Sequence, residues 1–297
     1  MARVTRLFRP SEYLRPASVT EAAGLLERYE EKGRILAGGT DLMVEKDPKI
    51  EALIDISGLK LDYIRSNGDG VRIGAAVVFA DIAASAELAK EPYSVLAQAA
   101  AQIGTPQIRN MATIGGNICS AVPSADSAPA LLALDATLLI TGPAGQKTMS
   151  IATFFKGPRK NALEKGELVT EIQLPSFAPR TASAFIKKGR VAVADLALVN
   201  VAVRLTLTED GLGRDVRIAL GAVAPAPLRA EKAEAMLEGR QPQPELLAVV
   251  ADQASREIKP ISDIRASKEY RVTLSRVLVE RALQEALNRV ETTAVNH

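Results

Sequence analysis

Apolar and polar residues alternate most regularly beyond about residue 180. Between residues 199 and 207, valines and leucines alternate with polar residues such as Asn200 and Arg204. This period of two predicts a β-strand that is buried on one face only. The run Asp210–Gly213 predicts a hairpin turn, and residues 215–223 a returning strand.

From Arg229 onward, apolar residues recur at the spacing of a helix rather than a strand. Glycine commonly ends a helix, and Gly239 is expected to end the first of these. Three helices are predicted, at residues 229–238, 244–256 and 266–290. A sheet followed by three helices indicates a separate α+β domain over residues 180–290.

The beginning of the chain alternates short helices and strands. Ser18–Glu21 has the capping-box pattern that opens a helix. After it we expect a strand, a short helix capped by Thr40 and a second strand. These three elements are predicted at residues 34–36, 42–46 and 52–56. Together they predict a small α/β unit, which we assign to residues 1–57.

Residues 58–177 continue this alternation and are assigned to a second unit. Asp81 is expected to cap one helix and Pro92 to start another. Prolines Pro175 and Pro179 mark the boundary with the C-terminal domain. A further helix is expected at residues 127–134, and strands at 71–75, 137–141, 147–151 and 167–174.

Two Gly-Gly segments carry the candidate chemistry. Glycine adopts positive φ and lets another molecule approach the backbone closely. Successive free N–H groups in such loops favour anions, above all phosphate. Two of these loops indicate a long diphosphate-containing ligand held from two sides, although either one alone is also compatible with a plain chain reversal. The segments are Leu36-Ala37-Gly38-Gly39-Thr40-Asp41 and Thr113-Ile114-Gly115-Gly116-Asn117, the second followed by Ser124 and Asp126.

Composition and charge exclude several classes of protein. The net charge of +2 provides no basic stripe, so no nucleic-acid surface is expected. No apolar run reaches the roughly 18 residues of a membrane helix. The first ten residues carry arginines with no apolar stretch behind them, so no secretory signal is expected. We therefore expect a cytoplasmic protein without membrane insertion.

Histidine and cysteine each occur only once, as His297 and Cys119. Structural zinc sites and iron–sulfur clusters need about four such ligands, so this chain alone holds no metal. Catalysis by a Ser–His or Cys–His pair is also excluded, and no catalytic residue is assigned. Redox chemistry on this chain would have to come from an organic cofactor.

Seven short motifs follow one another along the chain. They are Ala37–Asp41, Ala52–Ile56, Ile73–Ala75, Thr113–Asn117, Pro123–Asp126, Asp195–Asn200 and Leu220–Ala222. One Gly-Gly is a weak signal, whereas the ordered set is specific. In this order the motifs resemble those of a known family, the FAD-binding medium subunits of molybdenum hydroxylases. This is the xanthine dehydrogenase and CO dehydrogenase group, and the resemblance runs from about Phe8 to Arg289.

The resemblance implies an α+β architecture. Residues 1–57 and 58–177 would be the two lobes of a vanillyl-alcohol-oxidase-like (PCMH-type) FAD-binding domain. Residues 180–290 would form a C-terminal domain with a three-stranded antiparallel sheet and a helical bundle. FAD would lie between the two lobes and this domain. The chain has no G-x-G-x-x-G motif, so a Rossmann site is not expected.

The resemblance also implies roles for individual residues. Backbone amides of residues 38–41 and the Thr40 hydroxyl would hold the FAD diphosphate, while Asp41 would cap the next helix or face away. The segment 113–117 would form the second wall of the site. Asp126 would accept hydrogen bonds from the adenosine ribose hydroxyls. Lys187 would lie near the flavin pyrimidine carbonyls and stabilise negative charge on the reduced ring.

Simpler interpretations of four residues stay open. Asp126 could instead be a helix N-cap, and Lys187 a solvated strand residue. Cys119 is expected to be a buried apolar residue rather than a redox group. Asp195 is expected to bind its own loop rather than the flavin.

The implied holoenzyme contains a large molybdenum–pterin subunit and a small subunit with two [2Fe–2S] clusters. This heterotrimer is expected to be doubled. Electrons would pass singly to FAD and then in pairs to an acceptor such as NAD⁺. Thr40-Asp41 stands where CO dehydrogenases typically carry His-Ser, which favours a xanthine- or N-heterocycle-type enzyme. Alternatives are a CO or aldehyde dehydrogenase subunit, a flavin-free scaffold subunit and a stand-alone flavin enzyme.

Overall fold

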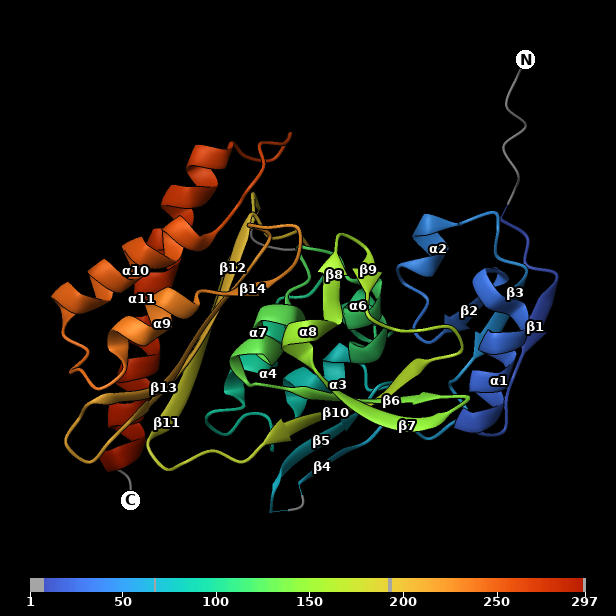
Figure 1. Ribbon diagram of the computed structural model, residues 1–297, viewed down its shortest axis with the longest axis horizontal. Helices are drawn as coiled ribbons and strands as arrows, with labels where there is room; N and C mark the ends of the chain where they lie inside the picture. The colour runs from blue at the N-terminus through green and yellow to red at the C-terminus, as the bar shows by residue number, and fades with distance from the viewer. Residues whose placement is uncertain (1–7, 67, 192–193, 296–297) are drawn as a thin grey trace.

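The protein consists of three bodies arranged in a row (Figure 1). The computed structural model describes residues 8–66, 68–191 and 194–295. An N-terminal lobe lies at one end, a middle lobe at the centre and the C-terminal domain at the other end. Within the described residues, no helix combines the length and the apolar character needed to cross a membrane.

The N-terminal lobe is a small parallel sheet covered by one helix. Ser18 caps the helix α1 (Val19–Tyr29) as expected, since its hydroxyl accepts from the Glu21 N–H at 3.1 Å. Thr40 does not cap the short helix α2 (Leu42–Glu45), because Asp41 takes the N-cap position and no side chain makes the cap bond. The expected cap by Thr40 is therefore wrong, and Asp41 stands at the N-cap position without a side-chain cap bond. The strands pair in the order β1 (Glu12–Leu14), β3 (Ala52–Asp55) and β2 (Gly33–Leu36).

The middle lobe packs short helices against an antiparallel sheet of five strands. In sheet order the strands are β4 (Ile64–Ser66), β5 (Gly70–Gly74), β10 (Leu168–Pro175), β6 (Thr137–Gly142) and β7 (Gly145–Ser150). The helices are α3 (Phe79–Ala84), α4 (Ser94–Ala101), α5 (Pro106–Arg109), α6 (Ile114–Ser120), α7 (Ser127–Ala133) and α8 (Ile151–Phe154). A hairpin of β8 (Phe155–Gly157) and β9 (Lys160–Asn161) follows α8. Asp81 lies inside α3, whose N-cap is Val78, so the expected cap by Asp81 is wrong.

The C-terminal domain packs three helices on an antiparallel sheet. The strands are β11 (Thr181–Lys188), β12 (Val199–Leu207), β13 (Gly213–Gly221) and β14 (Leu228–Arg229), paired in chain order. The two-residue β14 makes this a four-stranded sheet where the resemblance implied three strands. The three expected helices are present as α9 (Glu231–Leu237), α10 (Pro244–Glu257) and α11 (Lys268–Val295).

Strand β12 is buried on both faces, and the expectation of a half-buried strand is wrong. Its apolar side chains, such as Val201, join the core formed with α10 and α11. Its other face meets the middle lobe, where Ala202 joins the core of that lobe. Polar residues on this face have partners in the middle lobe: Arg204 forms an ion pair of 2.6 Å with Asp135, and a second one of 2.6 Å with Asp215 of the neighbouring strand β13. The alternation of apolar and polar residues showed that the two faces of this strand differ. It did not show that the middle lobe covers the polar face.

Candidate functional site

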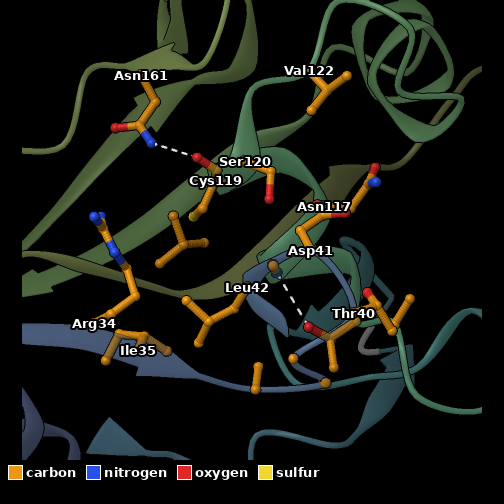
Figure 2. A pocket seen from close by; sticks show the side chains of 18 of the residues that line it. Arg34, Ile35, Thr40, Asp41, Leu42, Asn117, Cys119, Ser120, Val122 and Asn161 are labelled. Atoms are coloured by element: carbon orange, nitrogen blue, oxygen red, sulfur yellow. Dashed lines mark hydrogen bonds between the residues drawn. The ribbon is translucent and has the colours of Figure 1, made fainter. Parts of the chain in front are cut away.

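A cavity of about 890 Å³ lies between the N-terminal and middle lobes. Figure 2 shows Arg34, Ile35, Thr40 and Asp41 of the N-terminal lobe on one side. Figure 2 also shows Asn117 of the middle lobe among the lining residues. Of the residues expected at the site, the lining includes Ala37, Gly38, Gly39, Thr40, Asp41, Thr113, Gly115, Gly116, Asn117, Ser124 and Asp126. Leu36, Ile114 and Lys187 do not line it.

The first Gly-Gly segment is an open loop between β2 and α2, with Gly39 at a φ of +69°. Among the hydrogen bonds of the described residues, none has the backbone N–H of Gly38, Gly39, Thr40 or Asp41 as its donor. Successive free amides beside a cavity form the type of concavity that binds phosphate groups. This loop therefore fits the diphosphate of a dinucleotide such as FAD.

Gly38 has a second role, because it brings the two lobes into backbone contact. A Cβ atom at this position would lie 1.7 Å from the Met111 carbonyl oxygen and 2.6 Å from the Met111 carbonyl carbon. No side chain fits at that distance, and neither atom belongs to a flexible side chain that could move away. Only glycine allows the N-terminal lobe to approach the middle lobe here.

The second Gly-Gly segment is not a loop but the first turn of α6. Thr113 is its N-cap, and the Thr113 hydroxyl accepts from the Gly116 N–H at 3.2 Å. The N–H groups of Ile114 and Gly115 donate to the carbonyls of Val77 and Ala75. Because these amides already have acceptors, the expected pair of equivalent amide cradles is absent. The segment forms a wall of the cavity, and the amides of residues 114–117 are not free in the way that those of the first loop are.

Asp126 lies at the cavity wall as a buried carboxylate that is 6% exposed. Its Oδ2 is 2.5 Å from Lys187 Nζ, and its Oδ1 accepts from Asn200 Nδ2 at 2.7 Å. Burial raises the pKa of the Asp126 carboxyl, and the Lys187 ammonium opposes that rise. Asp126 takes the N-cap position of α7, but its side chain makes no cap bond. The N-cap interpretation therefore does not explain this side chain.

Lys187 is not the solvated strand residue that the simpler interpretation expected. Its side chain is only 8% exposed. Besides Asp126, its ammonium donates to the Gln102 carbonyl at 3.0 Å. Lys187 does not line the cavity, but its ammonium contacts Asp126, which does.

The simpler interpretation of Asp195 agrees with the structure, whereas Cys119 is half-buried rather than fully buried. Burial raises the pKa of the Cys119 thiol to about 12, which keeps it protonated at neutral pH. The Asp195 carboxylate accepts from the N–H groups of Arg190, Val191 and Leu196. These bonds hold its own loop and lower its pKa. Both residues nevertheless line the cavity.

The segment after α8 contributes part of the cavity that sequence reasoning missed. Arg159, Asn161 and Lys165 line it, and Asn161 donates to the Cys119 carbonyl at 2.7 Å (Figure 2). Ion pairs connect this segment to the N-terminal lobe: Arg159 with Glu45, and Lys165 with Glu30 at 2.7 Å. No local motif marks these residues, since only the meeting of the two lobes brings them to the site.

Two family descriptions together match most of the chain. The FAD binding domain in molybdopterin dehydrogenase matches residues 8–177, and the CO dehydrogenase flavoprotein C-terminal domain matches residues 184–286. The carbon monoxide dehydrogenase medium chain of Hydrogenophaga pseudoflava is 35% identical, over 93% of this chain and 96% of that protein. The glyceraldehyde dehydrogenase medium chain of Sulfolobus acidocaldarius is 33% identical, over 92% and 97%.

Solved structures agree with these matches. Carbon monoxide dehydrogenase from Hydrogenophaga pseudoflava superposes with a TM-score of 0.89 at 36% identity, covering 95% of this chain and 98% of that one. Quinoline 2-oxidoreductase from Pseudomonas putida superposes with a TM-score of 0.86 at 27% identity, covering 95% and 99%. As the ordered motifs predicted, the chain belongs to the FAD-binding medium subunits of the molybdenum hydroxylases, a family of oxidoreductases.

Proposed function

We propose that this chain binds one FAD in the cavity between its two lobes and transfers electrons within a molybdenum hydroxylase. The observation that carries this proposal is the row of four free amides, at residues 38–41, on a cavity of about 890 Å³. Free backbone donors suit a diphosphate, and the cavity extends from them to the carboxylate of Asp126. The match to an FAD-binding domain family supports the same ligand.

Individual residues would share the binding of FAD. The amides of residues 38–41 and the Thr40 hydroxyl would donate to the diphosphate. Thr113, Gly115, Gly116 and Asn117 would form the opposite wall, and Asp126 would accept from the ribose hydroxyls. FAD supplies the redox chemistry, since it can take up electrons singly and give them up in pairs. The chain's own task is to orient the cofactor and to limit the access of water to it.

The proposed partners are a large molybdenum–pterin subunit and a small subunit with two [2Fe–2S] clusters, in a heterotrimer that is doubled. Electrons would enter from the clusters of the small subunit and leave to an external acceptor such as NAD⁺. The similarity to medium chains of carbon monoxide and glyceraldehyde dehydrogenases supports a multi-subunit enzyme.

We propose a xanthine- or N-heterocycle-type substrate for the holoenzyme, because Thr40-Asp41 departs from the His-Ser of typical CO dehydrogenases. The similar proteins include the FAD-subunit of a nicotinate dehydrogenase, and nicotinate is a nitrogen heterocycle. A CO or aldehyde dehydrogenase subunit is the second candidate, favoured by the identity to the two dehydrogenase medium chains.

Purification of the native complex tests this function. We expect the chain to co-purify with two companion polypeptides in equal amounts, with molybdenum, iron and visible flavin absorbance. A colourless chain that takes up no added FAD would support a flavin-free scaffold instead. Bleaching of the flavin by substrate without any companion would support a stand-alone enzyme.

A further inference from the structure

Asp126 is a buried residue of the middle lobe whose carboxylate binds side chains of the C-terminal domain. It precedes α7 but makes no cap bond to that helix. Both of its oxygens instead accept from the C-terminal domain, Oδ2 from Lys187 and Oδ1 from Asn200. A carboxylate that faces a cavity and is held from a neighbouring domain requires an explanation beyond the stability of its own helix.

The two donors form one cross-strand pair. Lys187 of β11 lies opposite Asn200 of β12 in the sheet register. Asn200 in turn lies opposite Gly221 of β13, where a Cβ would be 2.2 Å from Asn200 Oδ1. A side chain at position 221 would therefore displace the Asn200 amide. The pairing of the strands therefore fixes the positions of Lys187 and Asn200.

The orientation of the Asn200 side-chain amide lowers the stability of the fold. Its Oδ1 is buried without a hydrogen-bond partner among the described residues, and Asn200 itself is fully buried. A buried acceptor without a hydrogen-bond partner destabilises the folded state. Rotating the amide would not help, because it would place an oxygen against the Asp126 carboxylate. The observed orientation thus favours the donor to Asp126 over a satisfied amide oxygen.

Lys187 supplies the charge that this arrangement needs. A carboxylate with so little exposure is destabilised as an anion unless a cation accompanies it. An ionised carboxylate only accepts hydrogen bonds and has about four lone-pair directions. Lys187 and Asn200 occupy one direction on each oxygen, which leaves acceptor capacity at the cavity wall.

We propose that Lys187 and Asn200 are positioning residues that hold Asp126 ionised and in one orientation to receive the two hydroxyls of a ribose. The inference rests on the proposed FAD function. It assigns Lys187 to the nucleotide end of the site in place of the flavin ring. The C-terminal domain then shapes nucleotide binding through Asp126 without contacting the nucleotide through either residue.

The test measures ADP and FAD binding to the full chain, because ADP carries the ribose and the diphosphate but no flavin. We expect Lys187→Met to weaken both ligands about tenfold, the scale of a hydrogen bond to a charged group. Asp126→Asn should weaken both at least as much. If Lys187 acts through Asp126, the double variant should bind no more weakly than Asp126→Asn alone.

Lys188→Met is the matched control, since Lys188 is the next residue of β11 and is exposed. It should leave both affinities unchanged. Lys187→Arg should restore part of the ADP affinity, which a lost packing contact alone would not explain. Thermal unfolding of each variant identifies any that fail to fold, and Asn200→Ser, which keeps a donor, replaces Asn200→Ala if the latter does.

Two results would overturn the inference while leaving FAD binding intact. One is an unchanged ADP affinity in Lys187→Met together with a shifted reduction potential of bound flavin, which would place Lys187 at the ring. The other is a double variant whose loss of ADP and FAD binding free energy equals the sum of the losses in Lys187→Met and Asp126→Asn. An unmodified chain that binds neither FAD nor ADP would overturn the inference and the proposed function together.

Discussion

The two Gly-Gly segments have the same dipeptide but different structures. The first is an open loop whose amides, at residues 38–41, donate to no described residue. The second is the start of α6, whose amides donate to Ala75, Val77 and Thr113. The first segment can therefore bind a ligand through its backbone, whereas the second supports the wall against which the ligand would lie.

The difference shows that glycine is required for two separate reasons. At Gly39 the backbone has a positive φ and forms part of the open loop. At Gly38 and Gly115 the requirement is close packing, against Met111 in one case and Ala75 in the other. A Gly-Gly pair in a sequence does not distinguish these cases. The two cases can be distinguished by substitutions whose effects on stability and on FAD affinity are measured separately.

The largest effect is expected for Gly38→Ala. Its new methyl group would overlap the Met111 carbonyl, so the lobes must separate. We expect the free energy of unfolding to fall by about 3 kcal/mol or more, the upper range for overpacking. FAD binding should be lost. Gly24→Ala in α1 is the control, because nothing lies within 4 Å of its Cβ, and stability should be unchanged or slightly higher. Denaturant unfolding and FAD titration measure both.

A smaller effect is expected for Gly115→Ala. Its Cβ would lie 2.7 Å from both the Cβ and the carbonyl oxygen of Ala75, which lowers stability by about 1–3 kcal/mol. Since the Gly115 amide already donates to Ala75, the folded variant should keep most of its FAD affinity. An affinity loss as large as that of Gly38→Ala would contradict the distinction between the two segments.

Two threonines provide a matched comparison. Thr113→Val removes the N-cap bond to Gly116, so we expect about 1 kcal/mol lower stability with FAD affinity little changed. The Thr40 hydroxyl makes no hydrogen bond within the described residues and is free to donate to a diphosphate. Thr40→Val should therefore leave stability unchanged and weaken FAD about three- to tenfold. The reverse pattern would contradict both assignments.

The smallest effect concerns Cys119, the only thiol of the chain, near the end of α6. Burial raises its pKa to about 12, so thiol labelling should keep accelerating as the pH rises from 9 toward 12. This raised pKa also means that its contribution to stability is full below about pH 9 and is lost as the pH rises through 12. FAD should slow the labelling, because Cys119 lines the cavity. A rate that levels off near pH 9 would contradict the buried environment.

Much of the fold followed from local signals. The Ser18 cap, the three C-terminal helices and the strand at 199–207 were all predictable, because caps and periodicity act within a few residues. Asp81 was misassigned as a cap because the local pattern around it is ambiguous. Several polar residues near a helix start fit the same pattern, and the packing of Phe79 in the core decides where α3 begins.

The candidate site was predictable to the extent that its residues belong to motifs. Residues 37–41, 113 and 115–117 were found in this way, whereas Arg159, Asn161 and Lys165 were not. The ion pair of Asp126 with Lys187 joins positions 61 residues apart. The sequence around Asp126 gives no indication that Lys187 is its partner, and the sequence around Lys187 gives none of Asp126.

The amino-acid sequence by itself determined the family, the α+β class and the loop that can present free amides, since these depend on short motifs and their order. Only the tertiary structure decided that the amides of residues 114–117 already have acceptors, that β12 is covered on both faces and that Lys187 binds Asp126. Those outcomes depend on which surfaces meet, and surfaces meet through packing between segments far apart in the chain.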